Sequence, residues 1–183
     1  SEFTQIGEAI EVQVLEIDKE NRALYLQYNK CYDVTVKEEY SIYPAFEVFF
    51  DQLIEDMKAH ETEIDYFVLD LRNNTGGFSH LWDNAVAKHK KYLKQYPIKI
   101  LMGKGTYSAA VDAIDRTLFT FDDVVLYGEE AGQAVYNYTG IIESVLENTG
   151  GTLTVTTRKA FYRELNTRAY VRSEDIYAGV MPD

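Results

Sequence analysis

The stretch 64–77 reads IDYFVLDLRNNTGG and joins an apolar segment directly to a turn that carries two glycines. Residues 67–71 are mostly apolar, as in a strand that is covered on both faces, and the opposite charges of Asp70 and Arg72 can satisfy each other. The glycines at 76–77 tolerate positive φ, let the backbone approach a ligand and leave N–H groups free to point at it. The stretch predicts a central strand that ends either in an oxyanion-binding turn or in a plain strand-to-helix turn.

A second element, 103–110, reads GKGTYSAA and follows another apolar segment, 98–102. It opens a helix-like segment over 109–118, and Ser108 stands at the turn. A serine at the first turn of a helix lies at the positive end of the helix dipole, and the amide after it can donate to a developing oxyanion. Ser108 is therefore a candidate nucleophile, and the alternative is a helix N-cap serine.

Taken in order, five segments of the chain resemble the tail-specific or C-terminal processing serine peptidases. They span nearly the whole chain from Ala23 onward, at 24–29, 67–77, 103–110, 128–132 and 179–183. The family's strand-to-glycine motif, Asp-Leu-Arg-x-Asn-x-Gly-Gly, is matched by 70–77. Its nucleophile motif, a small or aromatic residue before Ser-Ala or Ser-Ser-Ala, is matched by 107–110, and the two motifs together are specific.

This resemblance implies an α/β fold with a ClpP/crotonase-like β-β-α core. It implies Ser108 as the nucleophile and the amides of Gly77 and Ala109 as the oxyanion hole, with Gly76 beside them. The substrate implied is a protein or peptide, and neither a cofactor nor a metal is implied.

The general base is where the chain departs from the family. Members with a lysine base carry it in a Gly-Lys-Gly loop, but the matching loop here, 132–135, reads GQAV. Lysine-free members, which resemble the tricorn core, use a histidine from a more N-terminal segment and an acidic residue near the C-terminus. Glu174 or Asp175 matches that acidic residue, or is a solvated loop charge. Tyr138 stands where these members carry a second motif's histidine, or is a packing residue.

Three histidines offer alternative bases. We expect His60, at the end of a predicted helix, and His89, in a lysine-rich stretch, to be solvated. His80 is three residues past Gly77 and within reach of the site, but the resemblance gives that position no role.

The N-terminal part predicts a β-hairpin. Apolar and polar residues alternate over 10–14, a turn follows at 18–21, and 23–28 continues as a second strand. The segment 30–43 has no sustained periodicity, so we interpret it as a surface loop or as the wall of a substrate groove.

The alternation of helical and strand patterns after residue 43 predicts a mostly parallel sheet. The expected elements are helices over 44–57 with Pro44 in the first turn, 80–96 and 109–118, strands over 98–102 and 124–127, and a β-rich part from 141 whose clearest strand, 152–157, follows a turn at 148–151.

Length and composition fit a single domain over 1–183. The chain is 46% hydrophobic, and its net charge of −12 argues against nucleic-acid and anionic membrane partners. Cys31 is the single cysteine, which excludes an intramolecular disulfide and a cysteine-based metal cluster, and we expect a free, unreactive thiol.

Both ends of the sequence look like the edges of an excised domain. Residues 1–3 resemble a cloning scar, 182–183 stop within the family's terminal motif, and no membrane span or secretory leader is apparent. We expect an upstream domain that supplies the missing histidine, and a secreted or surface-anchored bacterial protein.

Two functions of different classes remain open at this stage. The first is a serine endopeptidase domain with Ser108 as its nucleophile. The second is a degenerate domain that holds an extended peptide by β-addition at a strand edge. A crotonase-like acyl-CoA enzyme, which needs no serine nucleophile, ranks third. Neither the cleavage preference nor the oligomeric state follows from the sequence.

Overall fold

The computed structural model describes residues 13–35, 44–133 and 136–161. Its strands are β1 (Gln13–Asp18), β2 (Ala23–Tyr28), β3 (Tyr66–Asp70), β4 (Ile98–Met102), β5 (Val124–Gly128), β6 (Tyr136–Val145) and β7 (Thr152–Phe161), and its helices are α1 (Phe46–Ala59), α2 (His80–Leu93) and α3 (Ala109–Thr120).

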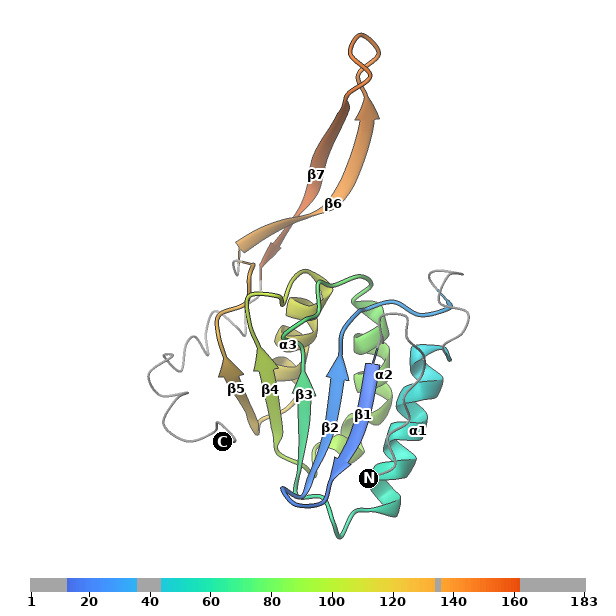
Figure 1. Ribbon diagram of the computed structural model, residues 1–183, viewed down its shortest axis with the longest axis vertical. Helices are drawn as coiled ribbons and strands as arrows, with labels where there is room; N and C mark the ends of the chain where they lie inside the picture. Colours follow the sequence, from blue (N-terminus) through green and yellow to red (C-terminus); the bar gives the residue numbers. More distant parts are fainter. Residues whose placement is uncertain (1–12, 36–43, 134–135, 162–183) are drawn as a thin grey trace.

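Strands β1 to β5 form one sheet in sequence order, with β3 at its centre. The β1/β2 pair is antiparallel, and the other neighbours are parallel. Because each parallel pair is joined by a helix, and such crossovers are right-handed, consecutive strand order places all three helices on one face (Figure 1). The predicted N-terminal hairpin and mostly parallel α/β sheet are confirmed.

The central strand differs from its prediction in one respect. Phe67 and Leu69 are buried beneath the helices, whereas Val68, on the opposite face, is half-buried. Among the described residues, helices cover one face of the sheet and not both. The apolar run predicted that the strand is covered on both faces. Val68 shows that an apolar residue on the second face does not by itself indicate such cover.

The core is centred on an aromatic cluster between the sheet and two helices. Tyr28 of β2 stacks on Phe46 of α1 at 4.7 Å, and Trp82 of α2 meets Phe50 of α1 edge-on at 5.6 Å between ring centroids. The Trp82 indole N–H donates to Thr117 Oγ1 of α3 at 3.0 Å, so its polar atom is satisfied inside the core. Burial of each such ring contributes about 1.5–3 kcal/mol.

Helix α1 starts later than expected and is capped from a distance. Pro44 lies two residues before its first helical residue, outside the first turn. The buried carboxylate of Asp33 accepts a hydrogen bond from the Phe46 N–H at 2.7 Å, so it satisfies one of the free amides at the helix start. Residues 30–35 are thus packed structure and not a plain surface loop, and 36–43 lie outside the described residues.

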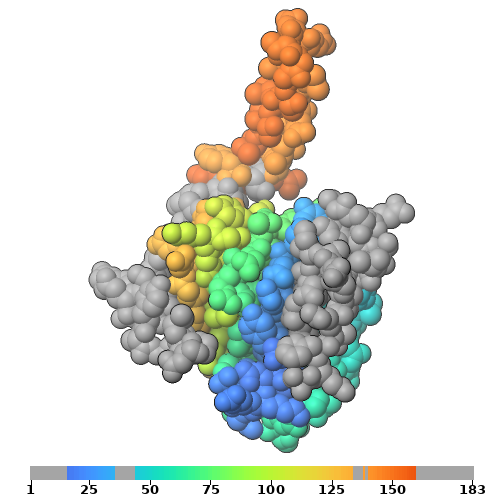
Figure 2. Space-filling model, viewed as in Figure 1, coloured from blue at the N-terminus to red at the C-terminus, as the bar shows by residue number. Residues whose placement is uncertain are grey.

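Strands β6 and β7 form a separate antiparallel ribbon, which confirms the predicted β-rich part. The ribbon extends beyond the end of the body (Figures 1 and 2). It begins at Tyr136, earlier than the expected 141, and includes Gly140 at φ 70°. None of the helices in the described part of the chain has the length and apolar character needed to cross a membrane.

Candidate active site

Four loops meet at the carboxyl edge of the parallel strands. They follow β2, β3, β4 and β5, and they contain residues 29–33, 71–77, 103–108 and 129–133. Open α/β sheets bind ligands at this edge, because consecutive strands deliver their loops to the same side. The topology therefore brings both of the motifs singled out in the sequence to one place (Figure 1).

The glycine loop is held by the segment after β2. Cys31 N–H donates to Gly76 O at 3.0 Å, and Phe78 N–H donates to Cys31 O at 2.8 Å, which makes a single parallel bridge between Cys31 and Gly77. In this bridge Cys31 bonds to the residues on either side of Gly77, so the Gly77 N–H points away from Cys31. Within the described residues, no hydrogen-bond acceptor is found for it.

Asn74 determines which N–H of the glycine loop has a hydrogen-bond acceptor. Its side chain is fully buried, donates to Tyr28 O at 2.8 Å and accepts from the Gly76 N–H at 2.8 Å. Its own carbonyl accepts from the Tyr107 N–H at 2.9 Å. One residue therefore joins β2, the glycine loop and the turn before Ser108, and it occupies the Gly76 amide so that Gly77 remains.

Ser108 has an unusual backbone conformation. It immediately precedes α3 with φ 52° and ψ −123°, and it is one of two non-glycine residues with positive φ in the described part. Such conformations cost about 1–3 kcal/mol and persist where the surroundings impose them, often at functional sites. Here the surroundings are the glycine loop. A Cβ built on Gly76 would lie 2.6 Å from Ser108 Cβ and 3.0 Å from Ala109 N.

The first amide of α3 is also unengaged. Ala110 N–H donates to Tyr107 O at 3.0 Å and Val111 N–H to Ser108 O at 2.8 Å, but Ala109 N–H has no acceptor among the described residues. An amide in this position carries the positive end of the helix dipole. Ser108 and Ala109 thus lie against Gly76, and the next residue, Gly77, adds a second amide for which the described residues offer no acceptor.

Gln133 lies against Ser108. The Ser108 N–H donates to Gln133 Oε1 at 2.9 Å. The preceding Gly132 is pinned, because its N–H donates to Thr106 O at 3.2 Å and a Cβ on it would lie 2.3 Å from the Tyr107 ring. The loop after β5 thus places a neutral amide at Ser108, and an amide does not take up a proton near neutral pH.

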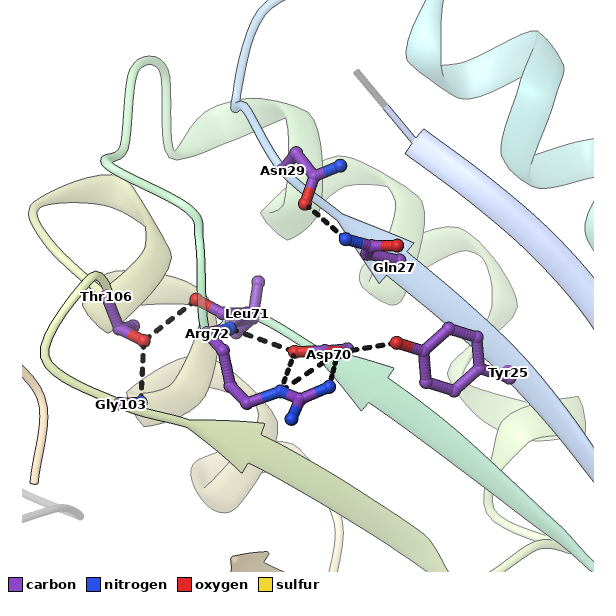
Figure 3. Close-up of polar contacts among 8 residues, drawn as sticks. All are labelled: Tyr25, Gln27, Asn29, Asp70, Leu71, Arg72, Gly103 and Thr106. Carbon is purple, nitrogen blue, oxygen red and sulfur yellow. Dashed lines mark hydrogen bonds and ion pairs between the residues drawn. The ribbon is translucent and has the colours of Figure 1, made fainter. Parts of the chain in front are cut away.

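A charged cluster supports the base of the glycine loop (Figure 3). Asp70, 2% exposed, accepts from Arg72 Nη2 at 2.7 Å and from the Tyr25 hydroxyl at 2.5 Å. Burial by itself raises the pKa of Asp70, but the hydrogen bonds from Arg72 and Tyr25 outweigh it and hold the pKa below its ordinary value. Burial and the bond to Asp70 raise the pKa of Tyr25 to about 12. The predicted Asp70–Arg72 pair is present.

Thr106 joins the loop after β4 to the loop after β3 by one hydrogen bond and closes its own loop by another (Figure 3). Thr106 Oγ1 donates to Leu71 O at 2.8 Å and accepts from the Gly103 N–H at 3.1 Å. Thr106 is fully buried, so these bonds fix the spacing between the strand end and the serine turn.

The histidines do not meet Ser108 through any contact found in the described residues. His60 follows α1 and lies 3.6 Å from Glu63, in accord with its expected exposed position. His89 is 16% exposed and bonded to Asp51 at 2.6 Å between helices, so its expected solvation is wrong. His89 stands in a lysine-rich stretch, but its side chain points inward because its helix, α2, faces α1. His80 begins α2, and its ring meets Phe78 edge-on at 5.9 Å.

The remaining candidate residues lie away from Ser108 or outside the described residues. Glu174, Asp175, Ala134 and Val135 fall outside the described residues. Tyr138 is 65% exposed on β6, so the packing interpretation is wrong for it. The described residues hold no group of three His, Cys, Asp or Glu side chains arranged for a metal ion. Cys31 is a buried free thiol, as expected, and burial raises its pKa to about 12.

The sequence analysis missed three residues that build the site. Asn74 and Thr106 were treated as parts of motifs, and Gln133 only as a departure from one. Each is a polar residue within one or two positions of a glycine, which is also typical of any turn. Their partners are 25 to 46 residues away in sequence, so only the folded chain shows them.

Comparison with known proteins gives a peptidase-like fold. No family model matches the chain, and no curated protein matches it in sequence. A Parabacteroides merdae protein assigned as a peptidase shares 15% identity at a TM-score of 0.54, over 90% of this chain and 57% of that one. A lipoprotein from Streptococcus agalactiae shares 14% identity at 0.50, over 80% and 57%.

A photosystem II D1 C-terminal processing protease shares 18% identity at a TM-score of 0.48, over 88% of this chain and 41% of that one. The chain therefore spans about half the length of these structures. At such identities the likeness to the first two is one of fold.

Proposed function

We propose that this chain is the core of a serine endopeptidase domain with Ser108 as its nucleophile. The observation that supports it best is the positive φ of Ser108 at the start of α3, pressed against Gly76. A strained serine at a helix N-terminus, beside free amides, is the arrangement that acyl transfer requires. The proposal places the chain in the lysine-free, tricorn-core-like branch of the C-terminal processing peptidases.

In the proposed reaction, Ser108 Oγ attacks the carbonyl carbon of a peptide bond while a base takes the hydroxyl proton. The Gly77 and Ala109 amides donate to the oxygen that becomes negative in the tetrahedral intermediate. The base then returns the proton to the amine that leaves, and water hydrolyses the acyl-enzyme. Removal of one such amide donor in a serine hydrolase costs about 10²–10³ in rate.

Ser108 needs a base from outside the described residues. Gln133 contacts the Ser108 amide but is neutral, and the three histidines contact Glu63, Phe78 and Asp51 instead of Ser108. We propose that a histidine from an upstream segment provides the base, with Glu174 or Asp175 orienting it. On this account the 183-residue chain alone is nearly inert, and the complete protein acts on protein substrates outside the bacterial cytoplasm.

The second candidate is a peptide-binding domain that has lost catalysis. The observation that favours it is the position of Gln133. Its amide oxygen accepts from the Ser108 N–H, so a neutral side chain occupies a place from which a basic group could have acted on Ser108. On this alternative the site would hold a peptide carbonyl without cleaving it, and an exposed strand edge would hold the extended chain.

Substitution of Gln133 by lysine tests the proposal. A lysine at this position supplies an amine next to Ser108, so we expect Gln133→Lys to gain labelling by a fluorophosphonate probe at alkaline pH, where the amine is neutral. Gln133→Met is the matched control of similar length without an amine. Labelling should be lost in Ser108→Ala/Gln133→Lys. A folded Gln133→Lys variant that labels no faster than Gln133→Met would contradict the nucleophile assignment.

A further inference from the structure

Two exposed aromatic side chains stand next to the two motifs of the site. Phe78 directly follows Gly77, Tyr107 directly precedes Ser108, and each of the two rings belongs to a side chain that is 41% exposed. In the described part of the body the other exposed large apolar residues are Val48 on α1, Phe119 on α3 and Val125 on β5. Exposed apolar surface beside a polar site is typical of a place that binds a ligand.

The Phe78 ring belongs to a group of three rings on the glycine-loop side of the site. It meets the Tyr32 ring edge-on at 5.5 Å and the His80 ring edge-on at 5.9 Å between centroids. Its backbone is fixed, since the Phe78 N–H donates to Cys31 O at 2.8 Å. A Cβ built on the exposed Gly77 would lie 2.8 Å from Tyr32 Cε2, so this group adjoins Gly77. We call Tyr32, Phe78 and His80 the aromatic wall.

Tyr107 is held on the opposite side of the site. A Cβ built on Gly132 would lie 2.3 Å from Tyr107 Cζ, so this ring packs on the loop after β5. The aromatic wall instead includes a residue of the segment after β2. Because the strands lie in the order β2, β3, β4, β5, the loops that carry Gly77 and Ser108 lie between the wall and the loop after β5 (Figure 1). The aromatic wall therefore borders the site from the β2 side.

The position and chemistry of the aromatic wall favour an apolar group of the substrate. In the proposed reaction the Gly77 N–H donates to the oxygen of the scissile carbonyl, and the side chain of that substrate residue branches from the carbon next to the carbonyl. This side chain therefore begins close to Gly77, against which the Tyr32 ring lies. Exposed rings gain free energy by covering apolar surface, and they return little to a charged group for its lost hydration.

We propose that the aromatic wall is the subsite for the substrate residue that supplies the scissile carbonyl, and that it selects large apolar side chains. The inference rests on the proposed function, because a carbonyl held at Gly77 is what brings that side chain to the wall. The substrate class that follows is a protein cleaved after a large aliphatic or aromatic residue. Phe78 contacts both other rings, so the preference should depend most on Phe78.

Two peptide boronic acids that differ only in the residue next to boron, phenylalanine in one and alanine in the other, test the proposal. Their affinities are measured with Gln133→Lys at alkaline pH, where the added amine can take up the Ser108 proton. We expect the phenylalanine compound to bind at least about tenfold more tightly than the alanine compound. This preference should be lost in Phe78→Ala/Gln133→Lys and largely kept in Phe78→Leu/Gln133→Lys, which retains an apolar side chain.

The matched control is Phe119→Ala/Gln133→Lys, which removes a phenylalanine ring that is 69% exposed near the far end of α3. This control should keep the preference. Adducts that form with equal affinity for both compounds, or a preference that survives Phe78→Ala, would overturn this inference alone. If neither compound forms an adduct, the assignment of Ser108 as nucleophile fails, and the inference fails with it.

Discussion

The loops around Ser108 and the β6–β7 ribbon differ in how their conformations are fixed. Around Ser108, hydrogen bonds from four loops converge within the body: Asn74 joins three segments, Thr106 joins two, and Gln133 closes the last. The ribbon is held by its own ladder and its turn, where Leu146 N–H donates to Gly151 O at 2.8 Å. The first arrangement can impose strain on a residue, whereas the second leaves apolar side chains such as Ile141 and Ile142 exposed.

The largest contrast should come from one substitution in each region. Gly76→Ala places a methyl group 2.6 Å from Ser108 Cβ and 2.8 Å from Tyr107 O, at φ 98°. We expect a loss of about 3 kcal/mol or more in the free energy of unfolding, or failure to fold. Gly150→Ala, at φ 66° with nothing within 4 Å, should cost about 1–2 kcal/mol.

Urea unfolding of both variants measures this difference. If Gly76→Ala is as stable as Gly150→Ala, the glycine loop does not press on Ser108 as described.

A smaller effect is expected when the buried amide is removed. Asn74→Ala leaves the Tyr28 carbonyl and the Gly76 amide without their partners, and we expect a loss of about 2–4 kcal/mol. The control is Thr157→Val on the ribbon, which removes an exposed hydrogen bond to Gly140 O and should cost less than about 0.5 kcal/mol. Amide exchange at Gly76 should quicken in Asn74→Ala. Unchanged exchange there would show that Asn74 does not hold the loop.

The acid sensitivity of the body should depend on Asp70. Its pKa is lowered in the folded protein, so its stabilising contribution is complete above its unfolded pKa of about 4 and is lost as the pH falls through the lower folded value. Asp70→Asn should therefore reduce stability at neutral pH by about 1–2 kcal/mol and flatten its decline between about pH 5 and pH 2. Chemical unfolding across that range measures it. A decline as steep as in the unmodified chain would assign the acid sensitivity to other carboxylates.

The sequence predicted the elements of the body well and the contacts of the site only in part. The 3.6-residue stripe from Phe46 to Met57 and the apolar strand before Gly76 each depend on local periodicity, which burial beneath one sheet face enforces. The two motifs lie at one edge of the sheet because the loops after parallel strands emerge at the same edge. The positive φ of Ser108 follows no such local period, and the residues that contact Ser108, Gly76 and Gln133, come from other loops.

The same reason explains the errors. His89 was placed in solvent from its lysine neighbours, but Asp51 on another helix holds it. Residues 30–35 lacked periodicity because they form single contacts, a bridge to Gly77 and a cap on α1. Such contacts follow no period, so pattern analysis does not detect them.

The most direct test of the account is an amide NMR titration with a peptide boronic acid, which forms a tetrahedral adduct on a nucleophilic serine. The account predicts that the Gly77 and Ala109 N–H resonances move downfield in Gln133→Lys at alkaline pH, where the added amine can take up the Ser108 proton, since these two amides would donate to the adduct. It predicts no such shift in Ser108→Ala and little change in the β6–β7 ribbon. Shifts that persist in Ser108→Ala, or that appear in the ribbon while Gly77 and Ala109 stay in place, would contradict it.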